Sequence, residues 1–166
     1  MYFDPTDPHL LDMIDRKDPE QTVKEIFLEN IASGDVVIDV GANIGDYALI
    51  ASKKVGDSGK VLAFEPLSET FSTLTRNLQL NEFTHCIPFQ KAVGEKSGIM
   101  NLYKSNQSGT MGYLDSSING QNLIKKNEIE VVTIDDVLSS NHIENVNMMK
   151  IDVEGFEHEV LLGCFQ

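Results

Sequence analysis

The sequence predicts an α/β fold with a mostly parallel sheet. Two apolar runs, at 36–40 and 60–64, have the length and composition of strands buried on both faces of a sheet. Each is followed by a stretch in which apolar residues recur at helical spacing, and a further apolar run at 146–153 repeats the pattern. Strands that alternate with helices favour parallel pairing through crossover helices. The 166 residues, 41% of them hydrophobic, suffice for a single domain with its own core.

The first part of the chain, residues 1–33, is expected to be a lead-in followed by one helix. Its beginning is rich in Asp and Pro, and Asp18 followed by Pro19 then has the pattern of a helix N-terminus. Gly34 has the place of a helix C-terminus, and residues 34–166 are expected to form the main part of the same domain. The apolar stripe of this helix is expected to consist of Val23, Ile26, Phe27 and Ile31.

The middle of the chain adds a third strand and a hairpin turn. The third strand covers 86–89 and is expected to continue to Val93, with Pro88 favouring an edge position because proline donates no hydrogen bond to the ladder. Residues 94–98 have the composition of a hairpin turn into a strand at 99–103. Helices are expected at about 45–55 and 67–80.

The region 104–127 is rich in Ser, Asn and Gly and lacks periodicity, which is unusual for a connection within a compact domain. It is interpreted either as a lid over the acceptor, meaning the substrate of a reaction at the sheet edge, or as a mobile surface loop. After it, residues 128–134 alternate as a strand does, Asp135 begins a short helix, and the run 146–153 forms the next buried strand. A last helix, ending at Gly163, is expected to turn Phe156, Val160 and Leu161 inward.

A glycine-spaced turn follows the first strand, within Val37-Ile38-Asp39-Val40-Gly41-Ala42-Asn43-Ile44-Gly45. Gly41 and Gly45 would let the backbone pass close to a ligand before a helix starts near Asp46. Such a turn at the carboxyl edge of a parallel sheet is typical of a nucleotide pocket. The turn, including Ala42 and Asn43, is therefore expected to bind a ligand.

The kind of ligand is inferred from Asp39 and Asn43. A dinucleotide site has the pattern G-x-G-x-x-G, whose middle glycine lets a pyrophosphate approach the backbone, and that position is Asn43 here. Asp39 would repel an anionic pyrophosphate but attract the ammonium and sulfonium groups of S-adenosylmethionine. The alternative is an ordinary strand-to-helix turn in which Asp39 and Asn43 only satisfy loop amides.

Glu65 ends the second strand twenty residues after Gly45 and is the expected ribose ligand. In a right-handed βαβ unit it comes to the same sheet edge as the glycine turn, where a carboxylate can accept both hydroxyls of an adenosine ribose. The alternative is a helix-capping or solvated acid. Pro66 follows directly and is also expected to contact the cofactor. Ala92, near the end of the third strand, is expected to lie by the adenine.

Charge and composition exclude several classes of protein. The formal net charge of −13 argues against binding to nucleic acid or to an anionic membrane surface. The chain has no apolar run of the ~20 residues that span a membrane and no signal-peptide pattern, so a cytoplasmic protein is expected. Cys86 and Cys164 lack a metal-binding or disulfide spacing and are interpreted as packing residues, and no metal site is expected.

Four motifs, in order, resemble those of the FkbM family of S-adenosylmethionine-dependent methyltransferases, which has a Rossmann-like class I methyltransferase fold. They are the glycine turn, Ala63-Phe64-Glu65-Pro66, Val132-Thr133-Ile134-Asp135-Asp136-Val137-Leu138 and Lys150-Ile151-Asp152-Val153-Glu154-Gly155. The resemblance implies that the turn and Asp39 hold the methionine part of the donor and that Glu65 holds its ribose. Asp152 and Glu154 would face the methyl group and the acceptor.

Asp152 is accordingly assigned to the methyl-donor side, and Glu154 to the acceptor side as a general base. In a regular strand the two side chains would point to opposite faces, but Gly155 permits a turn that brings both toward the pocket. The alternative for Glu154 is a cap on the following helix, whose N-terminus favours an acid.

The same resemblance implies a seven-stranded sheet of order 3-2-1-4-5-7-6, whereas the sequence reads as truncated after the fourth principal strand. The strands expected near 99–103 and 129–133 do not obviously replace the missing ones. The chain is interpreted either as a fragment or as a subunit whose open sheet edge is covered in a homo-oligomer, because an open strand of the buried type is a liability.

The function expected is methyl transfer from S-adenosylmethionine to a small-molecule acceptor, a hydroxyl of a sugar or natural product. Two alternatives remain. A non-catalytic module that binds an adenosine ligand is compatible with the truncated sheet, and a nicotinamide-dependent oxidoreductase shares the βαβ plan but would need a third glycine at Asn43.

Overall fold

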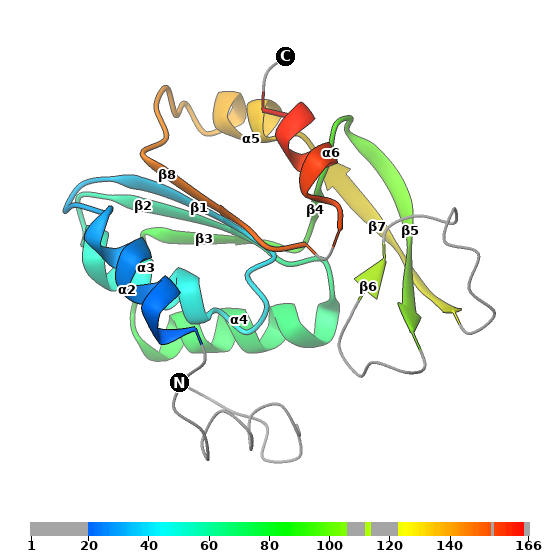
Figure 1. Ribbon diagram of the computed structural model, residues 1–166, viewed down its shortest axis with the longest axis horizontal. Helices are drawn as coiled ribbons and strands as arrows, with labels where there is room; N and C mark the ends of the chain where they lie inside the picture. Colours follow the sequence, from blue (N-terminus) through cyan, green and yellow to red (C-terminus); the bar gives the residue numbers. More distant parts are fainter. Residues whose placement is uncertain (1–19, 106–111, 114–122, 154, 165–166) are drawn as a thin grey trace.

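The protein is described from a computed structural model, in which residues 20–105, 112–113, 123–153 and 155–164 are placed. A four-stranded sheet of order β3-β2-β1-β8 forms its centre (Figure 1). All three pairings are parallel, as the sequence predicts. The strands are β1 (Val36–Val40), β2 (Lys60–Phe64), β3 (Cys86–Phe89) and β8 (Met148–Ile151).

The central strand β1 lies between β2 and β8. Val40, its last residue, is in register with Phe64 of β2 and with Ile151 of β8. The three strands therefore end together, and the segments that follow them meet at one edge of the sheet. β3, which contains Pro88, lies at the outer end of the sheet, as expected from the missing donor of proline.

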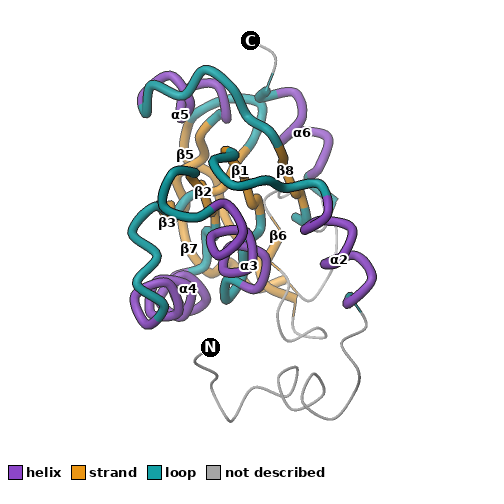
Figure 2. Tube along the Cα trace, turned by 90° about the vertical axis from the view of Figure 1, so that its left-hand side faces the viewer, coloured by secondary structure: helices purple, strands orange, loops and turns teal. Residues whose placement is uncertain are grey.

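Helices cover both faces of this sheet. The helices α2, α3 and α4 lie on one side and α5 and α6 on the other (Figures 1 and 2). Val37 of β1 packs in the cluster with the first group, whereas Ile38 and Val40 pack in the cluster with the second, as alternation along a strand requires. The bounds are α2 (Gln21–Glu29), α3 (Asp46–Val55), α4 (Ser68–Leu80), α5 (Ile134–Ser140) and α6 (Glu157–Leu162).

A second four-stranded sheet, of order β4-β7-β5-β6, corrects the predicted middle of the chain. The third strand does not continue to Val93, because Ala92 and Val93 pair in parallel with β7 instead. Residues 94–98 are not a hairpin turn, since β7 lies between β4 and β5. The strands are β4 (Ala92–Val93), β5 (Gly98–Ser105), β6 (Gly112–Tyr113) and β7 (Leu123–Val132).

β7 also begins before the predicted strand at 128–134, and its antiparallel ladder with β5 includes part of the region 104–127. That part is therefore a pair of strands and not a loop without secondary structure, and its role as a lid stays a prediction. The lid interpretation for 106–111 and 114–122 lies outside the described residues. The sequence did not predict this ladder, because the segment is polar and its residues do not alternate clearly. Its strands are paired through backbone hydrogen bonds, which any residue type except proline can form.

Helix α2 differs from its prediction in where it ends and in which residues of its apolar stripe are buried. It ends at Glu29, and Gly34 instead has a φ of 90° in the turn before β1, where its N–H donates to the Val55 carbonyl. Val23 and Ile26 are each 56% exposed, whereas the other two residues of the predicted stripe, Phe27 and Ile31, are buried. The proposed N-terminal cap, Asp18 with Pro19, lies outside the described residues.

The end of the chain also differs in detail from its prediction. β8 is shorter than the predicted run 146–153, and Leu161 of α6 is 46% exposed, although Val160 beside it is fully buried. Among the described residues no strand pairs with the outer edge of β8. Within the same part of the chain, no helix combines the length and apolar character needed to cross a membrane.

Candidate functional site

The turn after β1 is held against β2 by its own backbone. The N–H groups of Gly41 and Ala42 both donate to the Phe64 carbonyl, at 3.0 and 2.9 Å, and Gly45 N–H donates to the Ala42 carbonyl at 2.8 Å. Gly41, Asn43 and Gly45 have positive φ angles of 78°, 51° and 105°. This run of left-handed residues is what bends the chain from strand into helix within a few residues.

Internal packing explains why positions 41 and 45 are glycine, without any approach of a ligand. A Cβ atom on Gly41 would overlap the backbone carbonyl of Asp152, which follows β8. A Cβ atom on Gly45 would come 2.8 Å from the Leu74 side chain of α4. Both positions therefore require glycine for φ and for internal packing, so the motif alone does not demonstrate a ligand.

Asn77 of α4 fixes the same turn and was not predicted from the sequence. Its side-chain amide donates to the Ile44 carbonyl at 2.8 Å, and the residue is fully buried. The signal that could have revealed it is an amide beside Leu74 and Leu78 on the inward face of an amphipathic helix, because buried polar side chains are almost always hydrogen-bonded.

Asp39 is fully buried, and its carboxylate oxygens have no hydrogen-bond partner among the described residues. The Lys150 ammonium is 3.4 Å from one of them. Burial raises the pKa of the Asp39 carboxyl, and the Lys150 charge opposes that rise. Asp39 thus has no exposed surface and faces a lysine, and its contact with a cationic ligand stays a prediction.

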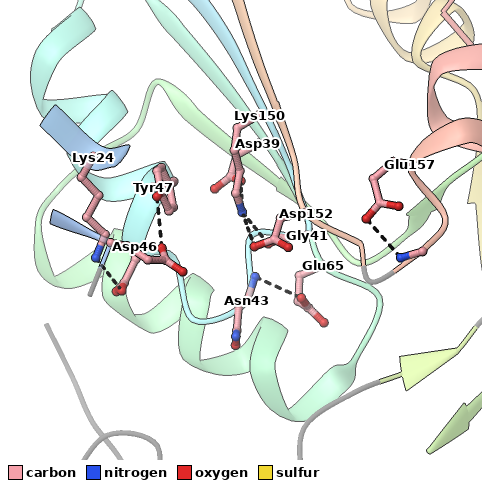
Figure 3. A network of polar contacts seen from close by, with 12 residues as sticks. Lys24, Asp39, Gly41, Asn43, Asp46, Tyr47, Glu65, Lys150, Asp152 and Glu157 are labelled. Atoms are coloured by element: carbon pink, nitrogen blue, oxygen red, sulfur yellow. Dashed lines mark hydrogen bonds and ion pairs between the residues drawn. The ribbon is translucent and has the colours of Figure 1, made fainter. Parts of the chain in front are cut away.

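Lys150 is the second site residue that the sequence analysis missed as a functional group. Its ammonium lies 3.2 Å from the Gly41 carbonyl, to which it donates, and 3.5 Å from the Asp152 carboxylate (Figure 3). It also lies 4.8 Å from the centre of the Tyr47 ring. One pattern in the sequence could have identified Lys150. It is a lysine in an otherwise apolar strand, and the neighbouring strand carries an acid.

Helix α2 is connected to the site through Tyr47. The Tyr47 hydroxyl donates to Glu20 at 3.1 Å, and its ring packs edge-on against Phe27 with a centroid distance of 5.2 Å. A second link joins Lys24 to Asp46 in the first turn of α3, at 3.4 Å (Figure 3). The residues just before and within α2 thus support the outer side of the Lys150 environment.

Glu65 bridges two turns at the same edge. Its carboxylate accepts from the Asn43 N–H at 3.0 Å and from the Leu67 N–H at 2.8 Å, and the residue is 6% exposed. Burial raises the pKa of Glu65, while the two backbone donors oppose the rise. These contacts fulfil the alternative structural role, yet each carboxylate oxygen can accept a further hydrogen bond. Figure 3 shows Glu65 beside Asn43 and near Asp152.

The other predicted site residues are Pro66, Ala92 and Glu154. Pro66 is half-buried, and Ala92 packs in the core of the second sheet with Ile129 and Val131. Glu154 lies outside the described residues. The alternative that Glu154 caps α6 therefore stays untested. Glu157, the first residue of α6, accepts from the Gly155 N–H at 3.1 Å, and this bond lowers the pKa of Glu157.

The two cysteines lie in apolar surroundings. Cys86 is buried, which raises its pKa to about 12, and Cys164 is half-buried beside an apolar cluster, so both are packing residues as expected. Within the described ranges, no three His, Cys, Asp or Glu side chains are grouped so that they could hold a metal ion.

The parallel sheet, with helices on both faces (Figure 1) and a glycine turn at its carboxyl edge, defines an α/β domain of the Rossmann-like type. The model of the methyltransferase FkbM domain matches residues 39–164. The chain therefore belongs to the FkbM family of methyltransferases. The matched range begins at Asp39 and includes Lys150, Asp152 and Glu65.

Individual relatives agree with the family. The hexuronic acid methyltransferase AglP of Haloferax volcanii is 35% identical over 87% of this chain. Methyltransferase 1 of Beauveria bassiana is 28% identical over 84%, and the 31-O-demethyl-FK506 methyltransferase FkbM of Streptomyces tacrolimicus is 28% identical over 78%. The chain spans 56%, 65% and 59% of the length of these three relatives, respectively.

A solved structure of a SAM-dependent methyltransferase from Aquifex aeolicus superposes on 54% of this chain and 49% of its own, with 27% identity and a TM-score of 0.40.

Proposed function

We propose that this chain transfers a methyl group from S-adenosylmethionine to a hydroxyl of a sugar or natural product. Membership of the FkbM family carries the proposal. The names of two relatives, a hexuronic acid methyltransferase and a 31-O-demethyl-FK506 methyltransferase, support this class of acceptor.

The charges at the sheet edge fit this donor better than a dinucleotide. Asp39 and Asp152 supply two carboxylates around the single ammonium of Lys150, and Glu65 lies nearby with a third. A net negative edge favours a ligand with positive groups and disfavours a pyrophosphate. The exposed Asn43 with its positive φ occupies the position at which a dinucleotide site has its middle glycine.

When bound, S-adenosylmethionine supplies a methyl group on a positively charged sulfur. The protein's part is then to hold two reactants in line, which can supply on the order of 7 kcal/mol. In this proposal the turn 41–45 and Asp152 hold the methionine end of the donor, and Glu65 accepts from its ribose. That Pro66 and Ala92 contact the cofactor, Ala92 beside its adenine, stays a prediction.

The proposal is tested with methyl-labelled S-adenosylmethionine, a panel of hexuronic acids, neutral sugars and polyketide alcohols, and mass identification of the product. Labelled product with one acceptor class supports it. Binding of S-adenosylhomocysteine in calorimetry without turnover on any acceptor would identify the chain as a binding module instead. Tighter binding of NAD than of S-adenosylhomocysteine would contradict the proposal.

Glu65→Gln is expected to weaken binding of S-adenosylhomocysteine by about 10-fold, because hydrogen bonds to a charged acceptor are worth ~1.5–3 kcal/mol. Affinity for methionine alone should not change. Calorimetry with the two ligands measures this, with Glu144→Gln, in an exposed loop, as the control. Equal losses for both ligands would show that Glu65 acts only through the turn it supports.

Glu154→Gln addresses the proposed acceptor base. Turnover is expected to fall at least ~100-fold, the usual size of a general-base effect, while donor affinity and melting temperature stay near those of the unchanged protein. Steady-state kinetics and thermal melting measure the two effects. A variant that loses stability and retains turnover would assign Glu154 to the start of α6.

The remaining expectations concern partners and location. We predict a small-molecule acceptor and no nucleic-acid partner. We also predict a cytoplasmic location and self-association through the outer edge of β8. Light scattering at high protein concentration tests the last, and a monomer would contradict it.

A further inference from the structure

Helix α2 is attached to the rest of the protein differently at its two ends. Its second half is anchored in the apolar core, where Phe27 and, just after the helix, Ile31 are 7% and 3% exposed. Its beginning lies on the surface, since among residues 20–26 only Lys24 is not exposed. A helix of nine residues is marginally stable in water by itself, so each half of α2 depends on its own contacts. We call the surface half, residues 20–26, the latch.

The latch is joined to the first turn of α3 by polar contacts. The Lys24 ammonium lies 3.4 Å from the Asp46 carboxylate, and these side chains are 18% and 22% exposed. The Tyr47 hydroxyl donates to Glu20 at 3.1 Å. Contacts whose charged partners keep access to water contribute modestly to stability. The latch can therefore open locally at little cost while the second half of α2 stays buried in the core.

The two residues that the latch contacts belong to the sheet edge. Asp46 and Tyr47 begin α3 directly after the turn 41–45. The centre of the Tyr47 ring lies 5.8 Å from the Lys24 ammonium and 4.8 Å from the Lys150 ammonium, and Figure 3 shows the ring between them. A change in the position of the turn therefore reaches the latch through side chains in direct contact.

We propose that the latch opens from and closes on the first turn of α3, with Phe27 as the fixed end, and that a ligand in the turn 41–45 favours the closed form. The ligand expected there is the methyl donor or its product, so this part rests on the proposed function. No contact between ligand and α2 is needed. A ligand that orders Asp46 and Tyr47 makes the latch contacts less costly to form, and by reciprocity the closed latch favours the bound ligand.

Amide hydrogen exchange of the full chain at low urea concentrations measures the opening of the latch without any ligand. The amides of residues 24–26 are expected to exchange through an opening that urea does not accelerate, because little surface is exposed in it. The amides of α4 should exchange more slowly and should accelerate with urea. Glu20→Ala/Lys24→Met removes both latch contacts from the α2 side and leaves the first turn of α3 unchanged. Glu29→Ala, an exposed change in the same helix, is the matched control.

In Glu20→Ala/Lys24→Met, exchange of the latch amides is expected to be about 3- to 10-fold faster than in the unchanged protein, and in Glu29→Ala less than about 2-fold faster. Saturating S-adenosylhomocysteine should slow this exchange at least about 5-fold in the unchanged protein. In Glu20→Ala/Lys24→Met the ligand should slow it less than about 2-fold, because the contacts that couple the latch to α3 are gone. Calorimetry establishes that each protein is saturated with the ligand.

A local opening of the latch is excluded if its amides exchange only by the urea-dependent route of α4, or if Glu20→Ala/Lys24→Met exchanges no faster than Glu29→Ala. Coupling to the ligand is excluded if bound S-adenosylhomocysteine slows exchange equally in the unchanged protein and in Glu20→Ala/Lys24→Met, or in neither. A different failure, in which calorimetry detects no binding of S-adenosylhomocysteine, removes the proposed function and the ligand coupling with it. The exchange measured without ligand still decides whether the latch opens.

Discussion

Gly41→Ala is expected to destabilise the protein by about 3 kcal/mol or more. A left-handed φ costs a residue with a Cβ roughly 1–2 kcal/mol, and forcing extra atoms into a packed site costs about 1–3 kcal/mol further. At Gly41 both apply, because φ is 78° and the new Cβ would overlap the Asp152 carbonyl. The overlapping atom belongs to the backbone, so relief requires the ends of β1 and β8 to move apart.

Two other glycines separate these contributions. Gly155 also has a positive φ, of 93°, but a Cβ there meets nothing within 4 Å, so Gly155→Ala should show the φ cost of roughly 1–2 kcal/mol alone. Gly98 has neither feature, and Gly98→Ala should stay within about 0.5 kcal/mol of the unchanged protein. Urea unfolding at constant pH measures all three. Similar losses at Gly41 and Gly155 would refute the overlap.

Lys150→Met is expected to cost about 3–5 kcal/mol of unfolding free energy, the usual loss when one partner of a buried ion pair is removed. The side chains of Lys150 and Asp39 are 16% and 0% exposed, so solvent cannot replace the missing cation. Adding Asp39→Asn should recover much of this loss, because no buried charge then remains. Urea unfolding of the two single variants and the double variant measures the coupling.

The loss in Lys150→Met should also depend on pH. Burial raises the pKa of Asp39 in the folded state, and without Lys150 the pKa rises further. A folded-state pKa above the unfolded value means that the contribution of Asp39 to stability is fully present below the unfolded pKa and is lost as pH rises through the folded pKa. The deficit of Lys150→Met should therefore shrink toward acid pH. Asp39→Asn/Lys150→Met should show no such recovery, and a constant deficit would exclude the pair as its cause.

The central sheet and the glycine turn were predictable because their signals are local. The apolar runs that became β1 and β2, and the positive-φ positions Gly41 and Gly45, follow from residue type over a few positions. The right-handed crossover rule then places Glu65 at the same edge as the turn. The short helix after Thr133 was also predictable, since the Thr133 hydroxyl accepts from the Asp136 N–H at its N-terminus.

The missed features depend on partners distant in sequence. β4 pairs with β7, which lies more than thirty residues away, and no local pattern distinguishes this from a hairpin with β5. The same holds for the site. The sequence shows the charge of Asp39 but not that β8 places Lys150 3.4 Å from it. The charge of a sequence motif becomes meaningful only when the neighbouring strand is known.

The bond between Lys150 and the Gly41 carbonyl joins residues that are 109 positions apart. Contacts of such separation require closure of a long loop, so they form late in folding and belong to the slow, non-local part of the topology. Asp39 is therefore without its counter-ion until β8 has docked beside β1. We expect Lys150→Met to speed unfolding and to leave the folding rate nearly unchanged, as measured by stopped-flow kinetics. The acidic edge of the sheet is thus completed by the final strand pairing, and any folding intermediate that lacks β8 leaves Asp39 without its counter-ion.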